Sequence, residues 1–253
     1  MMKIYILNLP RFRERLESIK RECARFELEP EFFSCVDVQN LSETEMRELV
    51  FDVERNPLCK SEIACFLSHL GIYRDMIEKD IPLALILEDD SVFNLDPRPL
   101  LDEMERQPAD APHVYLLTHR GGCYIDDYRL RIGDFKFHQG YDAYGANGYV
   151  LTKKAAANLL GFNMPLKCSG DWWRFFQING LIQFFICEKE IIGLHKELGA
   201  PSASLVENDR ATTYGPMRKK YDRHLRSQVP FICKVKYCLF KLKNLHKHKK
   251  RHK

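Results

Sequence analysis

Residues 83–93 read LALILEDDSVF, in which five apolar residues run directly into Glu88, Asp89 and Asp90. Five apolar residues bounded by polar ones are typical of a strand that is buried on both faces, as in a parallel sheet. Acids that follow such a strand lie at the edge of the sheet. Because three carboxylates within about 10 Å of extended chain repel one another, this stretch predicts a cation nearby.

The residues around this strand predict an α/β domain. The expected order of elements is strand, helix, strand, helix, strand, which is typical of a mostly parallel sheet with ligands at the carboxyl ends of its strands. The predicted segments are a strand at 3–9, a helix after Pro10 in RFRERLESIKRECARF, a strand at 29–38, a helix at 61–79 and the strand LALIL.

The second half of the chain predicts more elements of the same kind. HVYLLTH is a strand candidate, and the glycine- and tyrosine-rich stretch from residue 121 onward suggests an irregular wall over a site. Helices are expected at 152–163, where Thr152 is a good cap, and from Gly170 in GDWWRFFQING. IQFFICEKEIIGLH is strand-like, whereas 196–215 reads as a polar, mobile loop.

The 253 residues carry nine cysteines without a C-x-x-C pair, and no apolar run is long enough to cross a membrane. We therefore expect reduced thiols and a cytoplasmic protein. No G-x-x-x-x-G-K-[ST] loop is present, which disfavours an NTPase. The charge is uneven: 9 of the 39 Lys and Arg residues follow residue 230 without any acid, leaving 30 against 35 acids before it.

This charge pattern divides the chain into a globular domain, 1–230, and a basic tail, 231–253. An acidic body with basic residues at one end disfavours a nucleic-acid-binding surface. The tail predicts a helix with an apolar stripe between lysines, formed by Phe231, Ile232, Val235, Cys238, Leu239, Leu242 and Leu245. Such a stripe packs against the body or a partner subunit, or it lies on an anionic inner-membrane surface, which would make the protein peripheral on the inner face of the cytoplasmic membrane.

Five motifs in order, NLPRFRER, SEIACFLSH, ALILEDD, YGANGYVL and GDWW, resemble glycosyltransferase family 25, the bacterial lipooligosaccharide galactosyltransferases. The resemblance covers roughly residues 3 to 200, although Ser61 and Ala64 stand where the family commonly has glycine. It implies a GT-A-like domain that binds a nucleotide sugar, a divalent metal at a D-x-D-like motif, and UDP-galactose as the donor.

The metal expected from this resemblance is Mn²⁺ or Mg²⁺, both of which prefer oxygen ligands. By analogy with D-x-D, Asp90 ligates the metal and Glu88 points toward the ribose or a metal-bound water, while Asp89 faces away. The alternative is a solvated turn in which Asp90 or Ser91 caps a helix. His195 follows a late strand and is the candidate for a further ligand, or else is a structural histidine.

Two groups of side chains are candidates for substrate contacts. Asn8, Arg11 and Arg15 follow the first strand, where arginine can pair with phosphate and asparagine with uracil or ribose. The alternative is a surface helix in which Arg15 pairs with a neighbouring Glu. Glu62, Cys65 and His69 share one face of the 61–79 helix. Glu62 and His69 point toward the cleft or are a capping acid and a core histidine, and Cys65 is expected to pack in the core.

Asp171 is the candidate general base, with Glu62 as the second choice. An inverting transfer needs a carboxylate that accepts the proton of the acceptor hydroxyl as its oxygen attacks the anomeric carbon. The neighbouring Trp172 offers a flat face for a sugar ring, although Asp171 would also make a good helix cap. The sequence thus predicts a metal-dependent, inverting galactosyltransferase with a lipooligosaccharide acceptor. Another UDP-hexose, or a catalytically degenerate carbohydrate-binding or scaffold protein on this fold, is the alternative.

Overall fold

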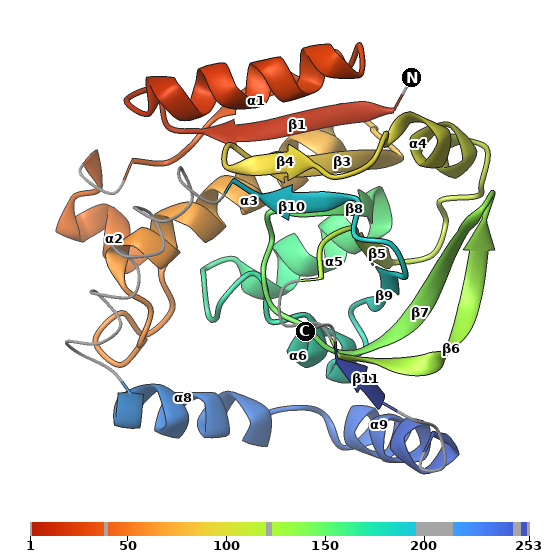
Figure 1. The fold of residues 1–253 in the computed structure, drawn as a ribbon. Helices are drawn as coiled ribbons and strands as arrows, with labels where there is room; N and C mark the ends of the chain where they lie inside the picture. The colour runs from red at the N-terminus through yellow and green to blue at the C-terminus, as the bar shows by residue number, and fades with distance from the viewer. Residues whose placement is uncertain (1, 38–39, 120–122, 196–214, 245–248, 252–253) are drawn as a thin grey trace.

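The computed structural model describes the chain except for residues 1, 38–39, 120–122, 196–214, 245–248 and 252–253 (Figure 1). In chain order its elements are β1 (Lys3–Asn8), α1 (Arg13–Arg25), β2 (Glu31–Ser34), α2 (Glu43–Leu49), α3 (Lys60–Glu78), β3 (Leu83–Glu88), β4 (Ser91–Phe93), α4 (Arg98–Glu105), β5 (His113–Leu116), β6 (Cys123–Ile132), β7 (Phe135–Asp142), β8 (Gly148–Thr152), α5 (Lys153–Asn163), α6 (Trp173–Ile178), β9 (Gln183–Cys187), β10 (Ile192–Leu194), α8 (Gly215–Ser227), α9 (Phe231–Lys243) and β11 (Lys249–Arg251).

Within the described residues, nine strands form one sheet in the order β11-β6-β7-β9-β5-β8-β3-β1-β2. The expected parallel start is confirmed, because β1 pairs in parallel with both β2 and β3. β8, β7 and β11 run opposite to the other six strands, so the sheet is mostly parallel but mixed. A separate ladder joins β4 to β10.

Helices cover both faces of the sheet, and LALIL is buried from both sides. Ala84 and Ile86 belong to the hydrophobic cluster that includes residues of α3, α5 and α6. Leu83, Leu85 and Leu87 belong to the cluster on the other face, with residues of α1 and α4 (Figure 1). This two-sided burial is the reason for the uninterrupted apolar run, because a strand with one wet face would alternate.

Several expected elements are confirmed with small shifts at their ends. The helix expected at 61–79 is α3, and the helix expected at 152–163 is α5, whose cap Thr152 accepts a hydrogen bond at Oγ1 from the Ala155 amide at 3.3 Å. The strand expected at 29–38 is shorter, since β2 spans only Glu31–Ser34. No helix within the described residues is long and apolar enough to cross a membrane.

Three expectations need correction. The irregular wall after residue 121 is a long hairpin, in which β6 pairs with β7 through several register shifts, followed by the central strand β8. The helix expected from Gly170 begins at Trp173, which leaves Asp171 in the preceding loop. The tail forms the expected helix over Phe231–Lys243 only, and Lys249–Arg251 pairs with β6 as a strand. Leu245 lies outside the described residues, and so does the predicted loop 196–215 except Gly215, which begins α8.

A glycine substitution tests the packing of this sheet. A Cβ on Gly140 of β7 would lie 1.9 Å from the buried Phe184 ring of β9. We expect Gly140→Ala to lower the free energy of unfolding by about 1–3 kcal/mol, the cost of overpacking a core. Gly161→Ala is the matched control, because among the described residues no atom apart from its chain neighbours and the backbone of its own helix α5 lies within 4 Å of the added Cβ. Alanine should raise stability there by about 0.5–1 kcal/mol. Urea unfolding measures both, and equal effects would contradict the strand packing.

Candidate active site

The acid triplet lies where β1 and β3 end side by side. Glu88 is the last residue of β3, and Leu7 of β1 is its partner in the ladder. Asp89 and Asp90 form the turn that leads into β4, and both are buried. Because β1 and β3 are parallel, whatever follows β1 is brought to the same edge of the sheet.

Arg15 and Asn8 hold the two aspartates. The Arg15 guanidinium contacts Asp89 Oδ1 at 2.7 Å and Asp90 Oδ2 at 2.5 Å. Asn8 Nδ2 donates to Asp89 Oδ2 at 2.7 Å. The structure therefore brings Asn8 and Arg15 to the acids themselves, and Asp89 is occupied on both oxygens. Arg11 is not in this set of contacts and instead forms an exposed ion pair with Asp37, which follows the parallel strand β2, at 2.6 Å.

The two arginines of this region should differ strongly in their effect on stability. Arg15→Ala leaves two buried carboxylates without their counterion, so we expect the free energy of unfolding at pH 7 to fall by about 3–5 kcal/mol. Arg11→Ala removes an exposed pair and should cost less than about 1 kcal/mol. Urea unfolding in metal-free buffer measures both. A loss below about 1 kcal/mol for Arg15→Ala would show that the pairing is not a structural requirement.

Asp90 keeps one oxygen unsatisfied. Its Oδ1 is buried and has no hydrogen-bond partner among the described residues. Burial raises the pKa of Asp90 to about 6, with Glu88 adding to the rise and Arg15 opposing it. An unpaired, buried carboxylate oxygen costs free energy unless a cation or a donor is bound there. The donor set fits the expected divalent ion, because Asp90 Oδ1 is a free anionic oxygen next to a second carboxylate, Glu88.

His195 is placed beside Asp90 by the small ladder between β4 and β10. Leu194 pairs with Ser91, and the His195 amide donates to the Asp90 carbonyl at 2.7 Å. The two residues are distant in sequence, yet their backbones are in direct contact. His195 is partly exposed, and its place as a metal ligand stays a prediction.

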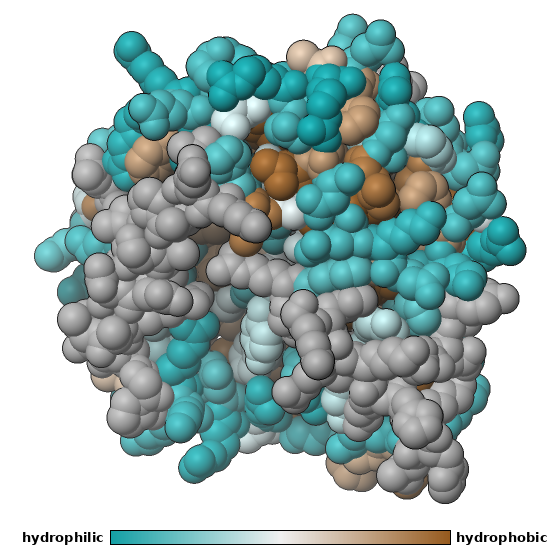
Figure 2. All heavy atoms as spheres, in the orientation of Figure 1, coloured by the Kyte–Doolittle hydropathy of each residue, from teal (hydrophilic) through white to brown (hydrophobic). Residues whose placement is uncertain are grey.

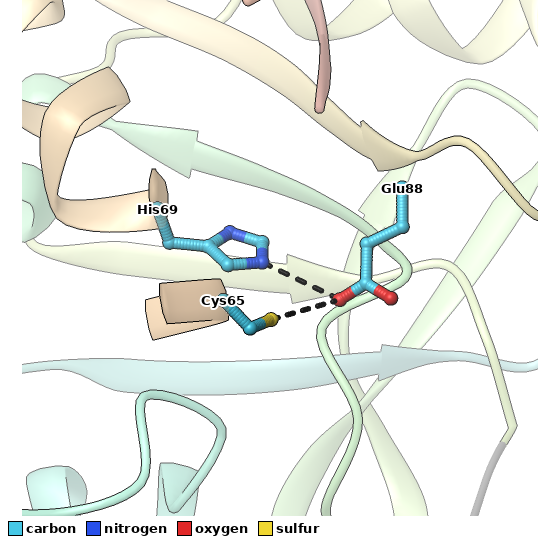
Figure 3. A group of neighbouring side chains, drawn as sticks. All are labelled: Cys65, His69 and Glu88. Atoms are coloured by element: carbon cyan, nitrogen blue, oxygen red, sulfur yellow. Dashed lines mark hydrogen bonds and ion pairs between the residues drawn. The ribbon is translucent and has the colours of Figure 1, made fainter. Parts of the chain in front are cut away.

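One carboxylate oxygen of Glu88 points toward α3. His69 Nε2 lies 3.4 Å and Cys65 Sγ 4.0 Å from Glu88 Oε1 (Figure 3). Ligand atoms of Cys65, His69 and Glu88 all lie within 4.8 Å of one another, so these three residues could also hold a metal ion. On the far side of the ring, His69 Nδ1 lies 2.9 Å from the Tyr149 hydroxyl, which fixes the orientation of the imidazole.

The sequence placed Cys65 in the packing, but the structure brings its sulfur to the carboxylate. Burial raises the pKa of the Cys65 thiol well above its usual range, with contributions from Glu88, Asp171 and Asp90 among others. Glu88 ends β3, Asp90 lies in the turn after it and Asp171 in the loop before α6, and each adds to this rise. The spacing of Cys65 and His69, one helical turn apart, was the sequence signal for this cluster.

Glu62 is buried at the start of α3 and is used on both oxygens. Oε2 accepts a hydrogen bond from the Cys59 amide at 3.1 Å, which makes it part of a capping box, and Oε1 accepts one from Arg218 at 3.0 Å. Glu62 therefore has the capping role that was the alternative to a role in the cleft. Arg218, the ion-pair partner of Glu62, also lines a cavity beside Asp171.

Asp171 lies in the loop before α6 and is held by two donors. Oδ2 accepts from the Gly145 amide at 2.8 Å, and Oδ1 accepts from the Ser169 hydroxyl. Gly145 has a φ of +93°, a conformation that favours glycine, and its carbonyl accepts a hydrogen bond from Trp173 Nε1 at 3.0 Å. In this conformation the YGANG segment fixes the position of the Asp171 carboxylate.

A cavity of about 390 Å³ opens beside Asp171. Its lining combines aromatic rings, two carboxylates and three cations, a composition that suits a sugar: Asn56, Pro57, Leu58, Tyr144, Lys167, Cys168, Ser169, Asp171, Trp172, Arg218, Tyr221, Asp222 and Arg226. Trp172 is largely buried, because its ring stacks on Phe175 at 4.2 Å and lies 5.1 Å from the Arg226 guanidinium. Trp172 therefore presents the edge of its ring to the cavity and not an open face.

The α8 wall of this cavity was not identified from sequence. Arg218, Tyr221, Asp222 and Arg226 come from a helix that follows the segment outside the described residues. The Tyr221 hydroxyl is buried and has no hydrogen-bond partner among the described residues, so it is available to a ligand. A larger cavity, of about 890 Å³, lies at the opposite ends of β1 and β3, near Lys3 and Leu83, and contains none of the candidate residues.

Residues 1–172 match a protein family described as glycosyltransferase family 25 (LPS biosynthesis protein). This region includes the acid triplet, α3 and Asp171. The chain belongs to glycosyltransferase family 25, which confirms the resemblance drawn from its five motifs.

Curated relatives carry related names. Procollagen galactosyltransferase 2 of Homo sapiens is 24% identical over 173 residues, and a glycosyltransferase 25 family member of Aedes aegypti is 33% identical over 175 residues. The matches cover 64% and 62% of this chain but only 28% and 27% of the relatives, so the chain matches little more than a quarter of their length. Among solved structures, a Bacillus anthracis protein assigned as a glucose-1-phosphate thymidylyltransferase aligns with a TM-score of 0.41 and 11% identity, covering 86% of this chain and 98% of that one.

Proposed function

We propose that this glycosyltransferase is a metal-dependent, inverting enzyme that transfers galactose from UDP-galactose to a saccharide of lipooligosaccharide or lipopolysaccharide. The observation that carries the proposal is the buried, unpaired Oδ1 of Asp90 at the carboxyl edge of the sheet. The carboxylate of Asp171 lies on the loop that lines a polar, aromatic cavity nearby. In this proposal the site around Asp90 is the donor side, which binds the nucleotide sugar. The cavity beside Asp171 is the acceptor side, which binds the saccharide.

On the donor side, Asp90 and Glu88 are the residues that would hold Mn²⁺ or Mg²⁺, with His195 at the rim. A bound divalent ion would neutralise the diphosphate that leaves with uridine. Asn8 and Arg15 fix the aspartates, and Arg15 contributes a positive charge at the same place. Arg11 is exposed beside this edge, where we assign it and Asn8 to the nucleotide, and His69 supports Glu88 from α3.

On the acceptor side, Asp171 is the proposed base. Each of its oxygens accepts one hydrogen bond from the protein, and each retains a lone pair for an acceptor hydroxyl. The carboxylate takes the proton of that hydroxyl while its oxygen attacks the anomeric carbon from the face opposite the leaving diphosphate. Trp172 and the tyrosines of the cavity contact the acceptor ring.

The choice of substrate rests on names of relatives rather than on geometry. Curated relatives are called procollagen galactosyltransferases, which supports galactose as the transferred sugar, and the family description refers to LPS biosynthesis. The decisive experiment incubates the pure chain with UDP-galactose, UDP-glucose and UDP-N-acetylglucosamine, with and without Mn²⁺, and measures UDP release. We expect release with UDP-galactose and Mn²⁺, and a product of inverted configuration by NMR when a saccharide acceptor is present. Binding of saccharide without any release would instead support the noncatalytic alternative.

A further inference from the structure

Helix α9 packs against the body through one face only. Tyr237 accepts a hydrogen bond at its hydroxyl from Arg174 Nε at 3.0 Å, and the Cys233 thiol donates to the Asn179 carbonyl at 3.5 Å. Asn244, which ends the helix, is buried and accepts a hydrogen bond from Arg129 at 3.3 Å. These positions are four and seven residues apart, so they lie on a single inward face of the helix.

The opposite face of α9 is apolar and exposed. Phe231 is 81% exposed, while Ile232, Leu239 and Leu242 are each 59% exposed. Figure 2 shows brown and tan atoms at the lower edge of the molecule, where α9 lies in Figure 1. Large side chains of this kind in one stripe mark a surface that binds another apolar phase.

Lysines border this stripe on both sides. Lys236 and Lys243, two turns apart, follow one edge, and Lys234 and Lys241 follow the other. All four are exposed, although Lys234 Nζ also donates to the Ser227 carbonyl at 2.9 Å and Lys241 Nζ lies 5.3 Å from the Tyr237 ring centroid. The helix contains no acid. We name the stripe with its four lysines the lysine-edged face.

The charges of the lysine-edged face select among occupants. A second copy of the same face would bring lysines against lysines, which is unfavourable. The last nine residues of the chain contain five Lys or Arg and no acid, so they do not offer a complementary cover either. A surface that is apolar inside and anionic at its boundary satisfies both components of the face.

We propose that the lysine-edged face of α9 binds the surface of an anionic lipid bilayer, with its apolar side chains at the boundary between headgroups and acyl chains. The inference stands on α9 and does not depend on the proposed reaction. It has a consequence for that reaction, because α9 follows directly on α8, which lines the cavity beside Asp171. An acceptor carried on a lipid would then be held close to the cavity.

The test uses the full chain and sedimentation with vesicles. We expect binding to vesicles of phosphatidylglycerol and phosphatidylcholine, loss of that binding in high salt, and little binding to pure phosphatidylcholine. Phe231→Gln/Ile232→Gln/Leu239→Gln/Leu242→Gln should weaken binding at least about tenfold, and so should Lys236→Glu/Lys243→Glu. Both variants keep Cys233, Tyr237 and Asn244, so α9 should stay docked, as circular dichroism and urea unfolding can verify.

Matched controls carry the same changes elsewhere. Lys219→Glu/Lys220→Glu alters two exposed lysines of α8, and Phe32→Gln/Leu95→Gln alters two exposed apolar residues outside α9. Both should bind vesicles within about threefold of the unaltered chain. Undiminished binding by the α9 variants would overturn the proposal, as would equal binding to neutral vesicles. The proposal would also be overturned if the unaltered chain did not bind vesicles and light scattering showed a dimer that the apolar variant converts to a monomer.

Discussion

Asp171→Asn should reduce the rate of sugar transfer by at least about a hundredfold while the affinity for UDP-galactose stays nearly constant. The amide oxygen can still accept a hydrogen bond from the Gly145 amide, and the amide NH2 can donate to the Ser169 hydroxyl oxygen, so the loop should keep its shape. It has no basic carboxylate at neutral pH, so the acceptor hydroxyl retains its proton. Steady-state kinetics measure the rate, and calorimetry measures binding of the donor.

Glu62→Gln is the comparison for this variant. The glutamine oxygen can accept from the Cys59 amide or from Arg218, but without the charge that pairs with Arg218, so a moderate loss of stability is expected with a small effect on transfer. If Glu62 rather than Asp171 is the base, the order of the two effects on the rate reverses. Equal, small effects would place the base outside both residues.

Asp90→Ala should abolish the Mn²⁺ dependence of UDP binding and lower turnover by about a thousandfold or more, since a metal stabilises the leaving diphosphate by several kcal/mol. The fold should survive, because burial already disfavours the charged Asp90 carboxylate and Arg15 keeps its contact with Asp89. Calorimetry with UDP and Mn²⁺ measures the first effect, and UDP release measures the second. Near-normal transfer with the same Mn²⁺ dependence would contradict the assignment.

Cys65→Ser separates two possible positions of the metal. Cys65, His69 and Glu88 form a cluster of their own within 4.8 Å, on the α3 side of the triplet. If Asp90 and Glu88 hold the ion, Cys65→Ser should leave the Mn²⁺ dependence within about threefold, because sulfur is a poor ligand for Mn²⁺ or Mg²⁺. A loss as large as that of Asp90→Ala would move the metal to the α3 cluster.

Local sequence patterns predicted the elements that form the edge of the sheet where the acid triplet lies. The strands at 3–9 and 83–87 and the helix at 61–79 are present nearly as expected, because their residues are buried in continuous faces. The hairpin β6–β7 was missed because its strands alternate poorly and shift in register. The insertion of antiparallel β8 between β3 and β5 depends on long-range pairing, which no local pattern encodes.

The sequence predicted which residues form the site better than it predicted the contacts between them. The acid triplet, Arg15 and Asp171 carry their chemistry in short motifs, but the pairing of Arg15 with Asp89 and Asp90 depends on how β1 and β3 align. Arg218 and Arg226 were missed because α8 follows a long polar segment. The only local signal was the spacing of Tyr221 and Leu225, whose side chains are buried.

The pairing of Arg15 with the triplet also sets an electrical balance. Glu88, Asp89 and Asp90 carry three negative charges when ionised, and one guanidinium offsets one of them. The remaining charge of −2 equals in magnitude that of a single divalent cation. A bare nucleotide diphosphate would meet net repulsion at this edge, whereas its complex with one divalent ion would not. For the proposed metal-dependent reaction, we therefore expect a binding order in which the ion arrives before the nucleotide or together with it.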